Sequence, residues 1–360
     1  MTDPAVTVVV VSWNGAALLG PCLDALAQQT LPADRYQVWV VDNASTDGTA
    51  ELVRERWPRV RLLRNARNEG FAGGCNTGLR EVDTPYAVLI NNDAVAEPGF
   101  LAALLAAAEQ PGAQRVGALT AKVLFAPRFV PAPEPGPGVV TAAGGLLLRP
   151  LPDGQDAPEA VDLVNSTGNE LRADGFGQDR DWLALDRGPA AVDVFGFCGA
   201  AALLRMAALA ETGLFDDRFF LYYEDTDLSW RLRLHGWDIR YVAAATVRHA
   251  HAASSGEGSA LHRFHDDRNR LLCLLKCAPA PLAAGAVGRY LLTLASGVRR
   301  ERPPWPHTRL RVRALVSFLR LAPGVLADRR RIDRMLAEAG RSRQDIGALA
   351  VPAAPQHGYR

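Results

Sequence analysis

The first hundred residues alternate between two hydrophobic periods. Continuous apolar and β-branched runs, typical of strands buried on both faces, cover residues 7–12, 36–42, 59–64 and 86–91. Between them apolar residues recur at helical spacing, as in residues 18–26, and residues 46–56 follow side chains that can cap a helix. This alternation predicts an α/β fold whose sheet is mainly parallel and is sandwiched by helices.

The pattern changes in the middle of the chain. Residues 124–190 are rich in Pro and Gly, which predicts an irregular insert with some short strands. After it, we expect a helix at residues 224–235 and a short final strand at residues 239–242. The insert therefore interrupts the α/β domain.

The last hundred residues follow a helical pattern from Leu261 onward, with breaks at Pro279, at Pro281 and near residues 302–306. We therefore expect two parts: an α/β domain over residues 1–258, large enough to hold an active site, and a helical, basic C-terminal extension over residues 259–360.

Composition narrows the class of protein. The 360 residues are 48% hydrophobic and 22% charged, as in a packed globular protein, and the net charge of +1 gives no general attraction to nucleic acid. Five cysteines without a CxxC pair argue against a disulfide framework or zinc cluster.

The N-terminus runs straight into a strand, so we expect no cleaved signal and a cytoplasmic location. The apolar segment 282–298 is short and has Arg289 at its centre, so we expect a packed or surface-lying helix.

Polar side chains follow three of the predicted strands. Ser12 and Asn14 come after the first strand, Asp42 ends the second, and Asn92 and Asp93 follow the fourth. Ligands of open parallel sheets bind beyond the carboxyl ends of the strands. Each Asp alone could equally be a helix cap or a turn residue. Together they predict a carboxylate-lined crevice.

Residues 68–78, NEGFAGGCNTG, contain several glycines, among them Gly73, and the amide Asn76. They follow the third strand, whereas the dinucleotide fingerprint of a Rossmann epimerase or dehydrogenase follows the first. Two interpretations remain open: a tight loop into a helix, or a close backbone approach to a bound nucleotide.

An acidic group follows an aromatic run in residues 219–227. The spacing of Asp227 and Arg231 predicts an i,i+4 ion pair on the helix surface. Glu224 and Asp225 stand beside the aromatic side chains, where partial desolvation raises proton affinity, as a general base requires. Farther on, His249 follows the last strand and could complete a metal site with Asp93.

In this order the blocks VVSWNG, VVDNASTDG, GFAGGCNTG, INNDA and GLFDDRFFLYYEDTDLSWRLR resemble the family-2 glycosyltransferases of GT-A fold, in particular their bacterial rhamnosyltransferase-like and galactofuranosyltransferase-like branch. The resemblance covers about residues 6–256. It implies a site whose nucleotide-binding residues are Ser12, Asn14, Asp42, Gly73, Asn76 and Asn92.

The resemblance also implies the chemical roles. Asp93 and His249 would hold Mg²⁺ or Mn²⁺ against the donor diphosphate, Asp225 would be the catalytic base, and Glu224 would support the acceptor or the base. Asn91 stands where many relatives have Asp, which removes one negative charge beside the metal.

The function implied is inverting transfer of a sugar from a nucleotide-diphosphate donor to a hydroxyl of a glycan or lipid-linked acceptor, in cell-surface polysaccharide or glycolipid assembly. The alternative is a non-catalytic relative that binds sugar nucleotide as a scaffold. A nucleic-acid-binding role has only C-terminal arginines in its favour, without an aromatic platform.

Residues 299–334 hold eleven arginines against three acidic residues, a net charge of +8. An apolar stripe runs through this segment at Leu315, Phe318, Leu319, Ala322 and Leu326, although Pro323 is expected to interrupt the helix. Two interpretations stay open: binding to an anionic membrane surface from the cytoplasmic side, or packing on the catalytic domain.

Overall fold

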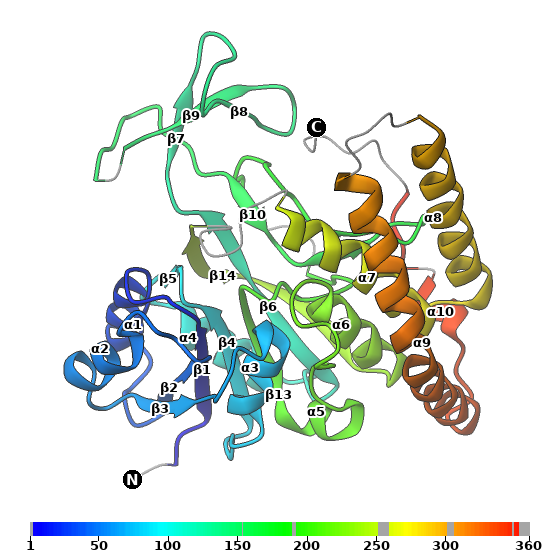
Figure 1. The fold of residues 1–360 in the computed structure, drawn as a ribbon. Helices are drawn as coiled ribbons and strands as arrows, with labels where there is room; N and C mark the ends of the chain where they lie inside the picture. Colours follow the sequence, from blue (N-terminus) through cyan, green and yellow to red (C-terminus); the bar gives the residue numbers. More distant parts are fainter. Residues whose placement is uncertain are drawn as a thin grey trace.

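The computed structural model describes residues 3–152, 154–188, 192–250, 259–300, 306–347 and 349–352. The first half alternates as predicted (Figure 1), with elements β1 (Val6–Ser12), α1 (Leu19–Ala27), β2 (Tyr36–Asp42), α2 (Thr49–Arg56), β3 (Arg61–Arg64), α3 (Gly70–Leu79) and β4 (Tyr86–Asn91). Helix α2 starts three residues later than predicted, because Gly48 before it has a left-handed φ of 86°.

The central sheet has the order β3-β2-β1-β4-β13-β6-β14-β5. Its first four strands are parallel, and β6 is parallel to β14, whereas β13 is antiparallel to both β4 and β6. The remaining elements of this part are β5 (Ala94–Ala96), α4 (Phe100–Glu109), β6 (Val116–Phe125), β13 (Ala201–Arg205), α5 (Met206–Thr212), α6 (Glu224–Leu234) and β14 (Asp238–His249). The final strand is therefore much longer than predicted.

Both faces of the sheet are covered, as the continuous apolar strands predicted. Alternate residues of β1 belong to different cores: Val8 and Val10 pack with α1 and α4, and Val9 packs with α3, α5 and α6. Helix α3 lies very close to β1, since a Cβ added at Gly74 or Gly78 would come within 2.6 Å of a valine methyl. The glycine-rich segment is therefore mostly helix, and these two glycines permit close packing.

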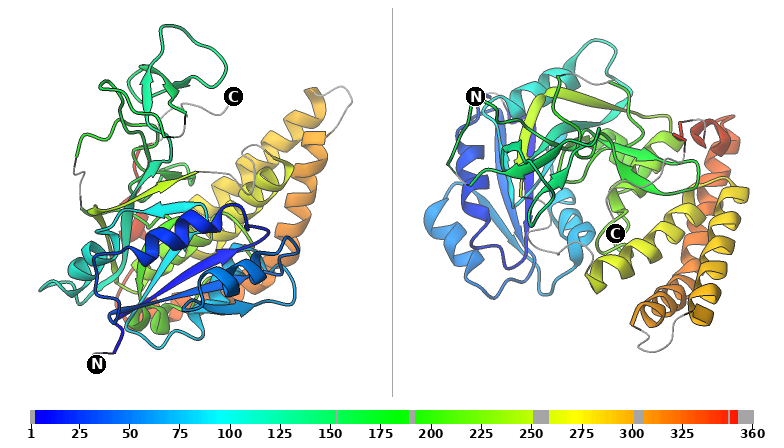
Figure 2. Two further views of the ribbon diagram at one scale, coloured as in Figure 1. Left: turned by 90° about the vertical axis from the view of Figure 1, so that its left-hand side faces the viewer. Right: turned by 90° about the horizontal axis from the view of Figure 1, so that it is seen from above.

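The insert consists of short strands, as predicted, with elements β7 (Phe129–Pro131), β8 (Val140–Thr141), β9 (Leu147–Pro150), β10 (Val164–Ser166), β11 (Asn169–Leu171) and β12 (Gly177–Asp179). Strands β7, β9 and β8 form a separate small sheet that extends away from the central sheet (Figures 1 and 2). Strand β10 adds to β6, and β11 pairs with β12.

The C-terminal part contains α7 (Ala260–Cys277), α8 (Ala280–Arg300), α9 (Pro306–Glu338) and α10 (Arg343–Gly347). Helix α9 continues through Pro323, so the expected interruption there is wrong, and Pro281 lies inside α8. The expected break at residues 302–306 lies largely outside the described residues. Among the helices that are described, no segment combines the length and apolar character needed to cross a bilayer.

Helix α7 shares a hydrophobic core with α6. This cluster joins Phe219 and Trp230 to Leu271, Leu274 and, from α9, Phe318. The α/β part and the helical part are thus in direct contact, as Figure 2 also shows for α6, α7 and α9. The proposed domain boundary after residue 258 remains a prediction, and residues 251–258 lie outside the described residues.

Candidate active site

The loops that follow β1 and β2 are tied together by side chains. Asn14, with a φ of 48°, accepts a hydrogen bond from the Thr46 amide at 2.8 Å, while its own amide donates to Ser45 Oγ at 2.9 Å. The Ala16 amide donates to Asp47 Oδ2 at 3.0 Å. These bonds place the residues at the two strand ends beside each other, as the crevice prediction requires.

Asp42 is fully buried at the end of β2. Its Oδ2 accepts from Arg64 Nε at 2.9 Å and its Oδ1 accepts from the Ser45 amide at 2.9 Å. Arg64 is half-exposed and covers this carboxylate. The nucleotide-binding role of Asp42 remains a prediction.

Ser12 and Asn92 form a second buried contact at the strand ends. Asn92 Nδ2 donates to Ser12 Oγ at 3.1 Å. A Cβ added at Gly15 would lie 2.3 Å from both side chains, so only glycine fits beside them. The pair joins the ends of β1 and β4.

Gly73 and Asn76 lie within α3. Asn76 is buried, and its amide bonds to both backbone groups of Phe215 and to Asp217 Oδ1. A Cβ at Gly73 would lie 2.6 Å from Cβ of Glu69. The structure thus uses Asn76 to hold the chain at residues 215–217, and the nucleotide-binding role of both residues remains a prediction.

The two predicted metal ligands meet at the edge of the sheet. His249 Nε2 lies 3.1 Å from Asp93 Oδ1, because β14 and β5 pair His249 with Ala94. His249 Nδ1 lies 3.0 Å from Asn165 Oδ1, and an amide oxygen only accepts, so Nδ1 carries the proton. Nε2 is the ring nitrogen that faces Asp93, and Asn91 Nδ2 approaches it at 3.3 Å.

This donor set fits a divalent ion that also binds phosphate oxygens. Within the described residues no group of three or more His, Cys, Asp or Glu side chains is arranged to hold a metal. Ions such as Mg²⁺ are commonly held by one or two protein ligands together with substrate phosphates. Asp93 and His249 therefore fit an ion that arrives with a diphosphate.

The predicted base and Asn91, which lies two residues before Asp93, contact adjacent residues of the chain. Asp225 Oδ2 accepts from the Gly199 amide at 3.1 Å, and the carbonyl of the next residue, Ala200, accepts from the Asn91 amide at 2.9 Å. Asp225 and the Asn91–Asp93 segment thus flank two consecutive residues at the start of β13. Sequence order alone did not provide this contact.

Asp225 opens helix α6 and is partly exposed. Burial raises the pKa of its carboxyl group, although hydrogen bonds from Asn169, Gly199 and Thr226 act in the opposite direction. The prediction of a raised proton affinity agrees with this direction. The group is therefore suited to accept a proton.

Glu224 is buried beside Asp225, and its Oε2 has no hydrogen-bond partner among the described residues. Burial first, then the charges of Asp225 and Asp227, raises the pKa of Glu224 well above its usual range. The role of Glu224 in supporting the acceptor or the base remains a prediction.

Asp179 is a carboxylate of this site that the sequence analysis missed. It receives hydrogen bonds from Ser166 and Cys198, and burial, together with the charge of Asp225, raises its pKa to about 6 while His249 lowers it. Asp179 lies opposite Asn169 in the β11–β12 pair, and Asn169 bonds Asp225. No periodic pattern marks this part of the insert, so the sequence offered no signal for it.

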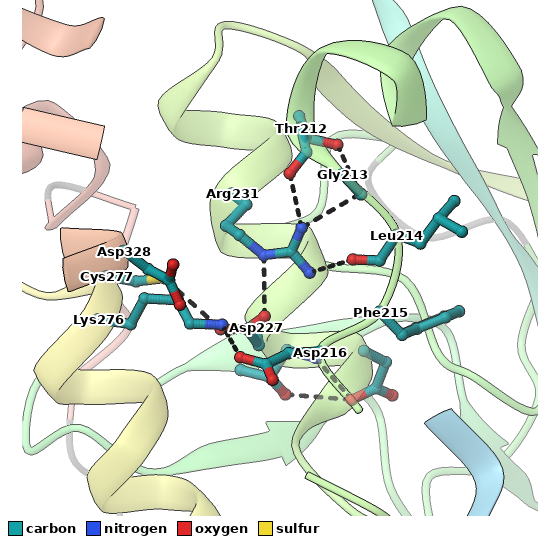
Figure 3. Close-up of polar contacts among 12 residues, drawn as sticks. Thr212, Gly213, Leu214, Phe215, Asp216, Asp227, Arg231, Lys276, Cys277 and Asp328 are labelled. Carbon is teal, nitrogen blue, oxygen red and sulfur yellow. Dashed lines mark hydrogen bonds and ion pairs between the residues drawn. The ribbon is translucent and has the colours of Figure 1, made fainter. Parts of the chain in front are cut away.

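Behind α6 lies a buried ionic network (Figure 3). Asp227 binds Arg231 at 2.9 Å, as its spacing predicted, but the pair is buried and not on the surface. Lys276 of α7 lies 2.8 Å from Asp227 Oδ1 and also binds Asp216. A cavity of about 360 Å³ opens beside the network, and none of the site residues predicted from the sequence lines it.

Comparisons with known proteins identify the family and the fold of the chain. Residues 7–128 match the profile described as Glycosyl transferase family 2. The chain is 30% identical over 281 residues to N-acetylglucosaminyl-diphospho-decaprenol L-rhamnosyltransferase of Mycobacterium tuberculosis (strain ATCC 25618 / H37Rv), which covers 73% of this chain and 81% of that protein. It is 26% identical over 258 residues to O-antigen biosynthesis protein RfbC of Myxococcus xanthus, covering 70% of this chain and 18% of that one.

Two solved structures share the fold. GalNAc-T7 with UDP, GalNAc and Mn²⁺ aligns with a TM-score of 0.56 at 13% identity, covering 87% of this chain and 54% of that one. S. aureus TarS 1-349 aligns with a TM-score of 0.51 at 15% identity, covering 96% and 89%. The fold is that of the GT-A glycosyltransferases, as the resemblance implied. The chain belongs to glycosyl transferase family 2.

Proposed function

We propose that this glycosyltransferase moves a sugar from a nucleoside-diphosphate donor to an acceptor hydroxyl with inversion at the sugar carbon. The observation that carries the proposal is the shared contact of Asp225 and the Asn91–Asp93 segment with Gly199 and Ala200. We propose that a diphosphate held at Asp93 and His249 presents its sugar to this base.

The residues divide the chemistry between them. The bond between the sugar carbon and the phosphate oxygen breaks, a bond to the acceptor oxygen forms, and Asp225 takes the acceptor proton. A divalent ion between Asp93, His249 and the diphosphate would neutralise the charge of the leaving group. Because one base acts from the side opposite the leaving group, the displacement inverts the sugar carbon. Glu224, buried beside Asp225, supports the acceptor or the base.

Asp225→Asn tests the base directly. With Mn²⁺ present, we expect turnover of the nucleotide-sugar donor to fall ~10²–10⁴-fold while nucleotide binding persists. Asp238→Asn, a half-exposed carboxylate paired with Arg233, is the matched control. Near-normal turnover in Asp225→Asn would remove this residue from the mechanism.

The alternative is a non-catalytic scaffold that binds sugar nucleotide. A thermal-shift screen of nucleotide sugars with and without Mn²⁺ identifies the donor, because a ligand of the native state raises its stability. Wild-type protein that is stabilised by a donor but never consumes it, with acceptor glycolipids present, would establish the alternative.

We propose a lipid-linked acceptor, since the M. tuberculosis relative is named for a decaprenol-linked one, and contact with the membrane surface. The apolar stripe expected in α9 is divided between the shared core and the surface. Phe318 is buried and Leu315 is partly buried in the core, whereas Leu319 and Leu326 are exposed. Val312 and Val316 are exposed as well, so these four side chains give α9 an exposed apolar face.

Arginines border this exposed face of α9: Arg309, Arg313, Arg320, Arg330 and Arg334 are all exposed. Apolar side chains beside basic ones suit a membrane with anionic headgroups. We expect the full chain to float with phosphatidylglycerol vesicles at moderate salt, and the double variant Leu319→Ser, Leu326→Ser to float poorly. No flotation of the wild type would refute membrane contact without affecting the transfer reaction.

A further inference from the structure

The segment that leads into the predicted base has an unfavourable backbone. Phe220, Tyr222 and Tyr223 have φ values of 64°, 68° and 66°. Bulky residues rarely adopt this left-handed conformation, and persist in it only where surrounding contacts impose it. Tyr223 is also the N-cap of α6, so this backbone sets where Glu224 and Asp225 begin the helix.

Asn269 of α7 supplies the contacts that hold this segment. Its Nδ2 donates to the carbonyls of Phe219 at 2.8 Å, Leu221 at 2.8 Å and Tyr222 at 2.7 Å. Asn269 is fully buried, and these acceptors lie 47 to 50 residues away in the chain. Because an NH₂ group has two protons, at least one of them is shared between two carbonyls, and this one side chain contacts three carbonyls of the strained segment.

Arg268 orients this amide. Its Nε donates to Asn269 Oδ1 at 2.8 Å, which turns Nδ2 toward the carbonyls. Its Nη2 donates to the carbonyls of Arg218 and Phe219, both at 2.9 Å. The two consecutive residues thus bind the strained segment from one side of α7.

The strained segment is joined to the site at its other end. The Tyr223 carbonyl accepts from the Asp227 amide at 2.9 Å, which closes the first turn of α6 around Asp225. Tyr223 OH accepts from the amide of Gly177 at 3.1 Å, and Gly177 is the first residue of β12, the strand that carries Asp179. A shift of this segment would therefore move the base relative to Gly199.

We propose that Asn269, oriented by Arg268, is a positioning residue of the active site: it holds the left-handed segment and thereby sets the location of Asp225. The inference rests on the proposed role of Asp225 as the base. It also makes α7 part of the catalytic machinery, although this helix lies beyond residues 7–128, where the family profile matches.

The test compares Asn269→Asp, which keeps the size but removes the donors, with Leu274→Ala. Leu274 is a buried residue of the same helix that belongs to the shared core, so its variant reports general loosening of α7. Each is measured for kcat and KM of donor turnover and for Mn²⁺-dependent binding of the nucleoside diphosphate. For Asn269→Asp we expect kcat to fall about 10²-fold, with nucleotide affinity unchanged within about threefold, since small misplacements of reacting groups cost rates of this order.

Hydrogen exchange of peptides covering residues 215–230 gives a second readout that does not need turnover. Asn269→Asp should speed exchange in this segment more than Leu274→Ala does. Unchanged exchange in Asn269→Asp, or a kcat equal to that of Leu274→Ala, overturns the inference. A wild type that never turns over any donor refutes the proposed function instead, and exchange then still decides whether Asn269 holds the segment.

Discussion

Lys276 offers a sharp test of how the helical part is joined to the α/β part. Its ammonium group is almost fully buried and binds both Asp216 and Asp227. In Lys276→Met a side chain of similar length replaces the ammonium group, and the two carboxylates lose a shared cation. Figure 3 shows the groups that remain around them.

The loss of unfolding free energy in Lys276→Met depends on the partners that the two carboxylates keep. Breaking a buried ion pair from one side costs about 3–5 kcal/mol, because the other charge stays buried. Here Asp227 keeps Arg231 and Asp216 keeps Arg218, so the lower end of that range, about 3 kcal/mol, is expected. The assay is urea unfolding followed by tryptophan fluorescence, since Trp230 is fully buried in the same core.

At low pH, the difference in unfolding free energy between the wild type and Lys276→Met should become smaller. Burial opposes ionisation of Asp216, but hydrogen bonds and charge from Arg218 and Lys276 hold its pKa below the usual range. A carboxyl group with a lowered folded-state pKa contributes stability above its unfolded pKa and loses it as pH falls through the folded pKa. The contribution of Lys276 should therefore be full at neutral pH and decline in strong acid.

Lys122→Met is the matched control. Among the described residues, Asp186 is the one carboxylate that pairs with Lys122, and both side chains are more exposed than Lys276 and Asp216. We expect this variant to cost about 1 kcal/mol or less. An equal effect of the two substitutions, or a cost below 1 kcal/mol for Lys276→Met, would refute the assignment of Lys276 as a buried link between the two parts.

Three further predictions concern the site and the sheet. Asn165→Ala should weaken Mn²⁺ binding about 10–100-fold, because Asn165 orients the His249 ring. Calorimetry in the presence of a nucleoside diphosphate measures the Mn²⁺ affinity, and an unchanged affinity would contradict that orientation. Gly74→Ala should destabilise the fold by about 1–3 kcal/mol, because the Cβ of the alanine would lie 2.6 Å from a methyl carbon of Val11. A melting temperature of the variant equal to that of the wild type would exclude the clash. Asp179 has a folded-state pKa raised to about 6, so the wild type should lose stability as pH rises from its unfolded pKa through 6. Asp179→Asn should then gain about 1–3 kcal/mol relative to wild type between pH 4.5 and 7.5 in urea unfolding, and parallel pH profiles would contradict the burial.

The sequence by itself determined the local elements and the strand ends. The spacing of hydrophobic residues predicted the bounds of β1, β2 and β4 to within one residue and those of α6 nearly to its end. This spacing depends only on which face of an element is buried, so it can be read from the sequence. It also put Ser12, Asp42 and Asp93 at neighbouring strand ends. The aromatic run before Asp225 and the position of His249 after the last strand made both residues candidates, and the family resemblance then gave each its implied role.

Tertiary structure decided which distant polar groups meet. Spacing predicted the Asp227–Arg231 pair but placed it on the surface, and the pair is buried because α7 brings Lys276 against it. The bonds of Asn269 to the strained segment join positions nearly fifty residues apart. Such partners are chosen by packing between elements, and a local pattern carries no information about which element will lie alongside.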